Sequence, residues 1–310
     1  MKKVVKALLI AALGIGAVAP IYAAESAGQA GAYLKMGVGA RALGMGSAFT
    51  AVANDSTAAF WNPAGLAKLK KHEASFMHAN LTDDRDYNFF NYAHVLNGKD
   101  GKSNGTLALS HINFGIDGIP ETREDNNGNP ELDPNGNVKI YSYFEDKETN
   151  TFISYGRAVT DKFYAGLNLK YLKHSLFNKK ADTMGLDFGF MYDYSDKTTL
   201  GLSIRDLGES MDWNTGHKDD VPVTTTFGVA HQCNDKLLVA ADLNKVKDMD
   251  VKFFCGAEYQ IHDNVSLRVG SHDSDLTLGA SFKLDTWRFD YSYADETLGD
   301  AHRISASKSF

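Results

Sequence analysis

The chain has 310 residues, of which 43% are hydrophobic and 23% are charged, and this balance excludes an intrinsically disordered protein. Its formal charge of −7 argues against a nucleic-acid binder, because lysine and arginine contacts to phosphates carry most of that affinity. The 18 Phe, 14 Tyr and 28 Gly, beside only 6 Pro, favour β-structure.

Residues 1–23 have the three parts of a secretory signal peptide. Three lysines within the first six residues form a positive start, an apolar run spans 7–19, and Ala23 or Ala24 offers a cleavage site. The apolar run is shorter than the roughly 20 residues that a membrane-spanning helix needs, and no later stretch is long and apolar enough. The sequence therefore predicts an exported protein and excludes a helical membrane protein.

Residues 24–71 are expected to form a separate N-terminal segment. Its centre reads "GARALGMGSAFTAVANDSTAAFWNPAGLA" from Gly39 to Ala67, which is rich in small residues and nearly uncharged. These residues predict a short, thin helix, and the Asn62-Pro63 pair predicts a turn after it. A dinucleotide-binding loop is rejected, because the glycines lack G-x-G-x-x-G spacing and no βαβ pattern follows. A segment of small, nearly uncharged residues is suited to packing in a confined space inside the protein.

From residue 72 to residue 310 the apolar residues recur with a period of two, which is the period of a β-strand. The pattern predicts an all-β fold of about fourteen strands, an even number of roughly ten residues each, as bacterial outer-membrane barrels require. The expected spans are 72–81, 86–95, 104–113, 149–158, 162–173, 183–194, 198–205, 222–231, 236–243, 251–261, 264–271, 275–284, 286–294 and 301–310.

One face of these strands is apolar, and the other carries glycine, serine, threonine and charges. The strands of a soluble β-sandwich also alternate between apolar and polar residues, so the lengths of the connections must distinguish a sandwich from a barrel. Short polar turns mostly alternate with longer connections, which is typical of an antiparallel outer-membrane barrel. The longest connection, 113–147, is expected to be an extracellular insertion. The final Phe310 is similar to the aromatic residue that the barrel-assembly machinery reads.

Eight charged side chains fall on the polar face of the expected strands and should point into the lumen. Barrel interiors are usually polar, so an ion-paired network is the favoured interpretation, although a catalytic carboxylate pair is left open. The sequence has no H-x-x-x-H, H-E-x-x-H or G-x-S-x-G motif, so no enzyme activity is predicted. The eight residues are Asp187, Arg205, Lys252, Glu258, Arg268, Arg288, Asp290 and Arg303.

The insertion contains oxygen-bearing side chains at every second position between residues 125 and 133, as a calcium loop would. An EF-hand is excluded because Pro130 stands at the sixth position, where that loop needs glycine. An irregular Ca²⁺ site and a solvated loop both remain open, and no cofactor is predicted. The only cysteines, Cys233 and Cys255, are placed two strands apart, roughly 9–10 Å, which is beyond the reach of a disulfide.

The segment Gly39–Ala67 closely resembles the N-terminal signature of the PorV/PorQ family, a branch of the FadL-like outer-membrane barrels. "DGIPETRED" at Asp117–Asp125 and the closing "HRISASKSF" are similar to the same family. The resemblance implies a 14-stranded barrel whose N-terminal segment folds into the lumen as a hatch, or plug. The motif residues of that plug are Gly39, Arg41, Gly44, Gly46, Asn54, Asp55, Trp61, Asn62, Pro63, Ala64 and Gly65.

Two functions follow from this resemblance. The PorV/PorQ signature implies a barrel that takes part in type IX-like protein export by docking cargo or secretion components at its external loops. The alternative is a FadL-like channel for small hydrophobic compounds such as long-chain fatty acids. A barrel without a conducted substrate is a third reading. In each case the expected location is the outer membrane of a diderm bacterium, with its lipid and the barrel-assembly machinery as partners.

Overall fold

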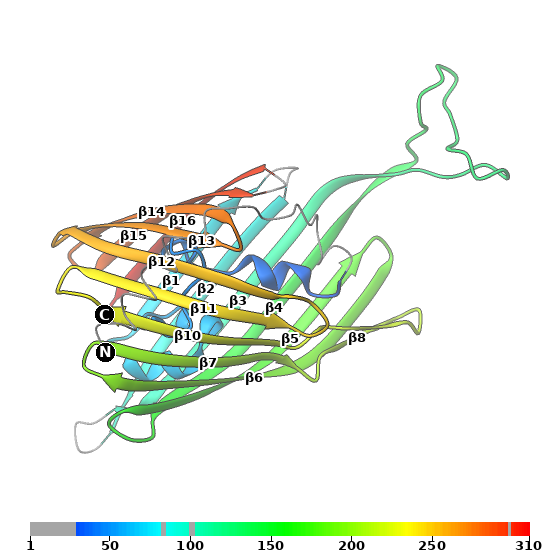
Figure 1. The fold of residues 1–310 in the computed structure, drawn as a ribbon. Helices are drawn as coiled ribbons and strands as arrows, with labels where there is room; N and C mark the ends of the chain where they lie inside the picture. The colour runs from blue at the N-terminus through cyan, green and yellow to red at the C-terminus, as the bar shows by residue number, and fades with distance from the viewer. Residues whose placement is uncertain (1–28, 82–84, 99–102, 297–298) are drawn as a thin grey trace.

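The structure is a computed structural model that describes residues 29–81, 85–98, 103–296 and 299–310. Fourteen antiparallel strands form a closed barrel, in which each strand pairs with its sequence neighbours, β10 pairs with β7, and β1 pairs with β16 (Figure 1). The predicted all-β barrel is therefore confirmed. The predicted signal peptide, 1–23, lies outside the described residues.

The wall strands follow the predicted spans, except that β3 to β6 extend beyond them at one end of the barrel. Their bounds are β1 Glu73–Asn80, β2 Arg85–Asn97, β3 Ser103–Glu121, β4 Ser142–Ala158, β5 Phe163–Leu176, β6 Lys179–Ser195, β7 Thr198–Leu207, β10 Thr224–Gln232, β11 Leu237–Val246, β12 Val251–His262, β13 Val265–His272, β14 Asp275–Leu284, β15 Trp287–Glu296 and β16 Gly299–Ser309. Two short strands, β8 (Ser210–Trp213) and β9 (Lys218–Asp220), form a hairpin that extends the sheet beside β6.

The two ends of the barrel differ. The turn end carries the short connections 159–162, 196–197, 233–236, 263–264 and 285–286. The loop end carries the β8–β9 hairpin and the connection 122–141, which projects away from the barrel as an arm (Figure 1).

The insertion predicted at 113–147 is too long. Strand β3 continues to Glu121 and β4 begins at Ser142, so only 122–141 lies outside the strands. The connection expected at 174–182 shrinks to two residues for the same reason, because β5 and β6 continue to 176 and from 179. Beyond the barrel, polar residues occupy both faces of a strand, so the alternation fades while the hydrogen-bonded ladder continues.

The outer surface of the wall is apolar and the inner surface is small or polar. Leu276, Leu278 and Phe282 of β14 are 52%, 44% and 48% exposed, whereas Thr277 and Ser281 between them are buried. An apolar outer band around a closed sheet is the surface that lipid requires, because every backbone group is already paired within the sheet. No helix in the described part of the chain is long and apolar enough to cross a membrane.

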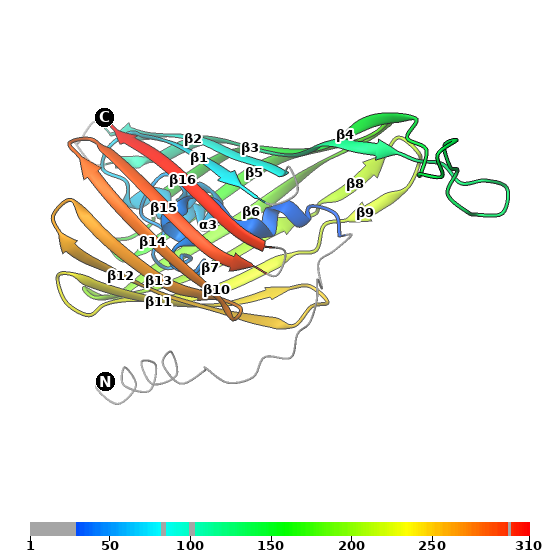
Figure 2. The ribbon, with the colours of Figure 1, turned by 90° about the horizontal axis from the view of Figure 1, so that it is seen from above.

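The N-terminal segment lies inside the ring of strands, as Figure 2 shows for α3. It contains η1 (Ala32–Met36), α2 (Ala40–Leu43), α3 (Ala58–Trp61) and η2 (Pro63–Lys68). Almost every residue from Val38 to Leu66 is buried, and its apolar side chains form one cluster with inward residues of β1, β2 and β10–β12. We call residues 30–70 the plug.

Candidate binding cavity between plug and wall

A cavity of about 150 Å³ lies between the plug and one side of the wall. The plug contributes residues of η1 and α3, and the wall contributes inward residues of β7 and β10–β13. Its lining is mixed, with both apolar and cationic side chains. The lining residues are Leu34, Lys35, Gly37, Ser47, Thr50, Phe60, Trp61, Arg205, Thr224, Thr226, Asn244, Val246, Met249, Lys252, Phe254 and His272.

Three cationic side chains line this cavity. The Arg205 guanidinium lies over the Phe60 ring at 4.9 Å, and no carboxylate of the described residues forms an ion pair with it. The Lys35 ammonium donates to Gln29 Oε1 at 2.5 Å, and the Lys252 ammonium lies 2.9 Å from an Asp273 carboxylate oxygen. Burial, and then the charge of Lys252, lowers the pKa of Lys35. The described side chains that line the cavity therefore include three cations and no carboxylate, while Asp273 and Asp206 lie close to these cations.

The apolar side of the cavity is held rigidly by the plug. Trp61 donates from Nε1 to the Val38 carbonyl oxygen at 2.9 Å, which fixes the indole ring. The Phe60 and Phe49 rings meet this indole edge-on, at centroid distances of 5.2 and 6.2 Å. Such edge-to-face contacts fix ring positions beyond what area burial alone gives. The cavity thus has a preformed apolar wall, and one of its cationic groups, Arg205, lies directly over a ring of that wall.

The plug is also tied to strands β12, β13 and β15 of the wall by a network of buried charges. Arg41 donates from Nε and Nη2 to the two carboxylate oxygens of Glu258, each at 3.0 Å, and from Nη1 to Asp55 Oδ2 at 3.0 Å. Arg288 reaches the same Asp55 oxygen at 3.1 Å. Arg268 lies 2.6 Å from Glu258, and this arginine and Arg288 both contact Asp290. Six residues predicted from sequence therefore meet here, together with the motif residue Asn54, which accepts from Arg41 at 2.7 Å.

The turn at Asn62 connects the plug to a second part of the wall. Its side-chain amide donates to the carbonyl oxygens of Thr50, within the plug, and Phe190, in β6, at 2.9 and 3.1 Å. Its Oδ1 accepts from the Ala64 amide at 3.2 Å, which caps η2. Asp242 of β11 adds a connection that sequence reasoning missed, because its carboxylate accepts from the amides of Phe49 and Thr50 at 3.1 and 2.9 Å.

The remaining predicted residues lie apart from this network. Arg303 is buried on the inner face of β16, and Lys252 lines the cavity. Phe310 is 56% exposed at the turn end, where its amide donates to the His72 carbonyl at 2.9 Å. Asp187 belongs to a separate group of buried charges.

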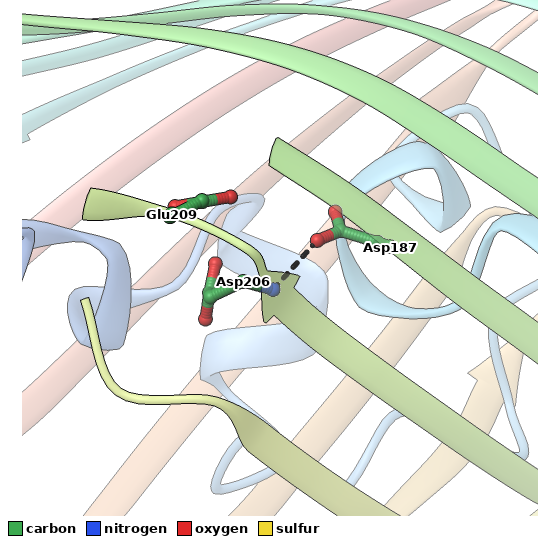
Figure 3. Close-up of side chains that lie close together, drawn as sticks. All are labelled: Asp187, Asp206 and Glu209. Atoms are coloured by element: carbon green, nitrogen blue, oxygen red, sulfur yellow. Dashed lines mark hydrogen bonds between the residues drawn. The ribbon is translucent and has the colours of Figure 1, made fainter. Parts of the chain in front are cut away.

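That group contains three carboxylates, Asp187, Asp206 and Glu209, which face one another (Figure 3). Their ligand atoms lie within 4.8 Å of one another, which is compact enough for a metal ion. The Lys170 ammonium, however, lies 3.0 Å from Asp187 and 2.6 Å from Glu209, and it also contacts Asp206. The ammonium occupies the position that a metal would need, so the group is a lysine-centred ion cluster. Sequence reasoning missed Lys170, although it shares the inward face of β5 with Asn168 and Leu172.

The two acidic turns of the arm serve the backbone. Asp125 accepts from the amides of Asn127 and Asn129 at 2.8 and 3.0 Å. The Asp133 carboxylate, which lies after Pro130, likewise accepts hydrogen bonds from the amides of Asn135 and Asn137. Among the described His, Cys, Asp and Glu side chains, no group of three gathers on this arm. The two carboxylates accept the hydrogen bonds that close its turns.

Both cysteines are free and half-exposed. Cys233 follows β10 at the turn end, and Cys255 lies within β12.

No protein-family model matches the chain, and no curated protein matches it. Solved structures that share its fold include the Pseudomonas putida toluene transporter TodX, with 15% identity over 88% of this chain and 97% of that one, at a TM-score of 0.58. The CymD monoaromatic hydrocarbon channel has 16% identity over 89% and 98%, at 0.59. A Pseudomonas aeruginosa FadL homologue has 13% identity over 83% and 94%, at 0.56. The chain therefore has the fold of the FadL-like barrels, and the finer PorV/PorQ assignment stays a prediction.

Proposed function

We propose that the chain is an outer-membrane channel that takes up small hydrophobic compounds carrying an anionic group. The observation that carries the proposal is the cavity between plug and wall, which has a rigid apolar side and three cationic side chains. Ligand sites are typically concave and mostly apolar, with a few polar groups that fix orientation. The neighbouring structures described as hydrocarbon channels and a toluene transporter support a channel over other roles of this fold.

The charge of the cavity favours an anionic head group. Arg205 has no carboxylate partner among the described residues, and Lys35 and Lys252 are like charges that an anion between them would stabilise. A planar guanidinium matches a carboxylate with two parallel hydrogen bonds. The head group would lie near Arg205, with the apolar part against Phe60 and Trp61.

The size of the cavity favours a small ligand. A dry cavity of about 150 Å³ is large enough for benzene, whereas drug-sized ligands need roughly 300 Å³ or more. A ring-sized or short-chain carboxylate fits without rearrangement. A long-chain fatty acid would place only its head end in the cavity.

Export docking, which the resemblance to PorV/PorQ suggested first, has that resemblance as its only support. The cavity has no role in docking cargo at external loops. We therefore rank the channel above export docking, and we infer that the loop end faces the cell exterior and the turn end faces the periplasm, as in other bacterial barrels.

Ligand titration tests the proposal directly. In detergent-solubilised protein, benzoate should change the fluorescence of the buried Trp61 with saturation, and toluene should bind more weakly. Arg205→Met should lower benzoate affinity by about tenfold, as loss of one charge-assisted contact of about 1.4 kcal/mol predicts. Arg123→Met, on the exposed arm, is the matched control and should leave affinity unchanged.

The outcomes separate the parts of the proposal. If benzoate and toluene bind equally well and Arg205→Met changes neither affinity, the ligand has no anionic group. The proposal would then reduce to a channel for uncharged hydrocarbons. No binding of either, together with periplasmic accumulation of exported proteins in cells that lack the chain, would favour export docking instead.

A further inference from the structure

At eight places the inner wall of the barrel has a glycine where the plug comes very close. Eight wall glycines, one on each of eight strands, lie against plug atoms. A Cβ added at six of them would come within 3.0 Å of the plug, and at the other two it would come within 3.1 Å. The eight are Gly156, Gly166, Gly189, Gly201, Gly228, Gly256, Gly270 and Gly279, on β4, β5, β6, β7, β10, β12, β13 and β14.

Seven of these glycines form three seats, defined by strand register. Gly156, Gly166 and Gly189 pair directly across β4, β5 and β6, and this first seat receives Pro63 and Ala64. The second seat, Gly201 with Gly228, receives Thr50. The third seat, Gly256 with Gly270, receives Met45 and Gly46.

Glycine in the interior of a strand weakens the strand, and it commonly marks a place where another backbone approaches closely. Wall side chains also supply hydrogen-bond partners to the plug main chain. Ser305 Oγ accepts from the Ala40 amide at 2.9 Å, and the Asn168 amide donates to the Ala59 carbonyl at 2.8 Å. Both sides are therefore incomplete alone: the wall lacks side chains at the seats, and the plug has only short helical turns, which leave part of its backbone to be satisfied by the wall.

We propose that plug and wall form one cooperative folding unit, in which residues 39–67 neither unfold nor leave the lumen while the barrel stays intact. Removing the plug would open voids at the three seats and leave buried polar atoms such as the Asp242 carboxylate without their partners. The plug therefore takes the place of the hydrophobic core of the barrel. In a densely packed interior, one packing partner cannot leave while the other stays folded, because its departure would leave voids. The proposal does not depend on what the cavity binds.

The three tryptophans of the chain allow this to be tested in the full-length protein. Trp61 lies in the plug, and Trp213 and Trp287 lie outside it. In a Trp213→Phe/Trp287→Phe protein, fluorescence reports the plug, while heat-modifiable gel mobility and far-ultraviolet circular dichroism report the wall. Urea unfolding in lipid vesicles should give one midpoint for all three signals. A Trp61 transition at a lower urea concentration than the wall transition would overturn the proposal.

A seat variant gives a second test. Gly166→Ala should lower the plug and wall midpoints together and by the same amount. Gly279→Ala lies outside the three seats but also faces the plug, where it adds a methyl at 3.1 Å from the Gly44 Cα, and it is the milder variant if Gly166→Ala fails to assemble. Gly115→Ala is the control, because its new methyl would have only one neighbour, at 3.5 Å. A seat variant that moves the Trp61 midpoint alone would show that the plug is a separate unit.

Discussion

Arg41 in the plug and Glu258 in strand β12 form a two-pronged ion pair, with both hydrogen bonds at 3.0 Å, although 217 residues separate them in the chain. Both side chains are mostly buried, with 12% and 17% of their surface exposed. Glu258 also holds Arg268, and Arg41 also holds Asp55, so the pair is the centre of the network that joins plug and wall.

Glu258→Met and Arg41→Met should each destabilise the barrel, and by similar amounts. Glu258→Met leaves Arg41 with Asp55 and Arg268 with Asp290, and Arg41→Met leaves Glu258 with Arg268 and Asp55 with Arg288. Each change leaves one buried charge uncompensated, and breaking a buried ion pair costs about 3–5 kcal/mol. Urea unfolding in vesicles measures both. Arg123→Met is the control, because its pair with Glu121 is exposed and should contribute under about 1 kcal/mol. A loss under about 1 kcal/mol for both buried variants would contradict the shared network.

Asn62→Ala should weaken the contact between plug and wall, while the barrel still assembles with the plug inside its lumen. The change leaves the carbonyl oxygens of Thr50 and Phe190 without their donor, and each unsatisfied buried group costs about 1–3 kcal/mol. Asn62→Asp keeps the acceptor for the Ala64 amide but not the donor, so it should resemble the alanine variant. The measurement combines heat-modifiable gel mobility with permeability to small solutes. Normal mobility with unchanged permeability would assign Asn62 a packing role only.

The contribution of Asp55 should disappear in acid. Burial alone would raise the pKa of Asp55, but the guanidiniums of Arg288 and Arg41 beside it lower the pKa to about 2. The pKa of an aspartate in an unfolded chain is about 3.9. The lowered pKa therefore adds about 2 kcal/mol to the free energy of unfolding, which is complete above that pH and is lost as the pH falls toward 2. The difference in unfolding free energy between the wild type and Asp55→Asn should therefore be constant from pH 5 to 8 and shrink below about pH 4. A difference that changes between pH 5 and 8 would point to another titrating group.

A charge on the outer face of β14 should destabilise the barrel in lipid. Leu278 is 44% exposed on the apolar band, and Leu278→Arg should cost about 2–4 kcal/mol if it lies near the bilayer midplane. Leu278→Ala is the control for lost packing. The comparison is made by urea unfolding in vesicles of defined lipid. A free-energy change for the arginine variant equal to that for the alanine variant would place this position outside the hydrocarbon region.

The strands were predictable because an apolar outer surface and a filled lumen impose a period of two. That constraint ends where the strands leave the barrel, which is why the far parts of β3 and β4, and the β8–β9 hairpin, were missed. Residues 142–147 carry polar or charged side chains on both faces, with Tyr143 and Phe144 interrupting, so they read as a loop.

The site was predictable only in part. Alternate residues of a strand point to the same face, and this rule correctly indicates which side chains face the lumen. Applied to β5 and β11, it would have found Lys170 and Asp242. The rule does not indicate which charged side chains form ion pairs. The pairing of Arg41 with Glu258 depends on where the plug lies against strands that follow some 200 residues later, and no local pattern encodes that position. The cavity, which forms between the same two parts, was equally invisible to local patterns.

The free thiol of Cys233 allows a chemical test of which end of the barrel faces the cell exterior. It lies directly after β10 at the turn end, and Cys255, the other cysteine, can be changed to serine to leave one reactive sulfur. A membrane-impermeant maleimide added to intact cells should leave that sulfur unmodified, and the same reagent should attach once the outer membrane is breached. Modification in intact cells would mean that the turn end faces outward, and that the arm at 122–141 reaches into the periplasm.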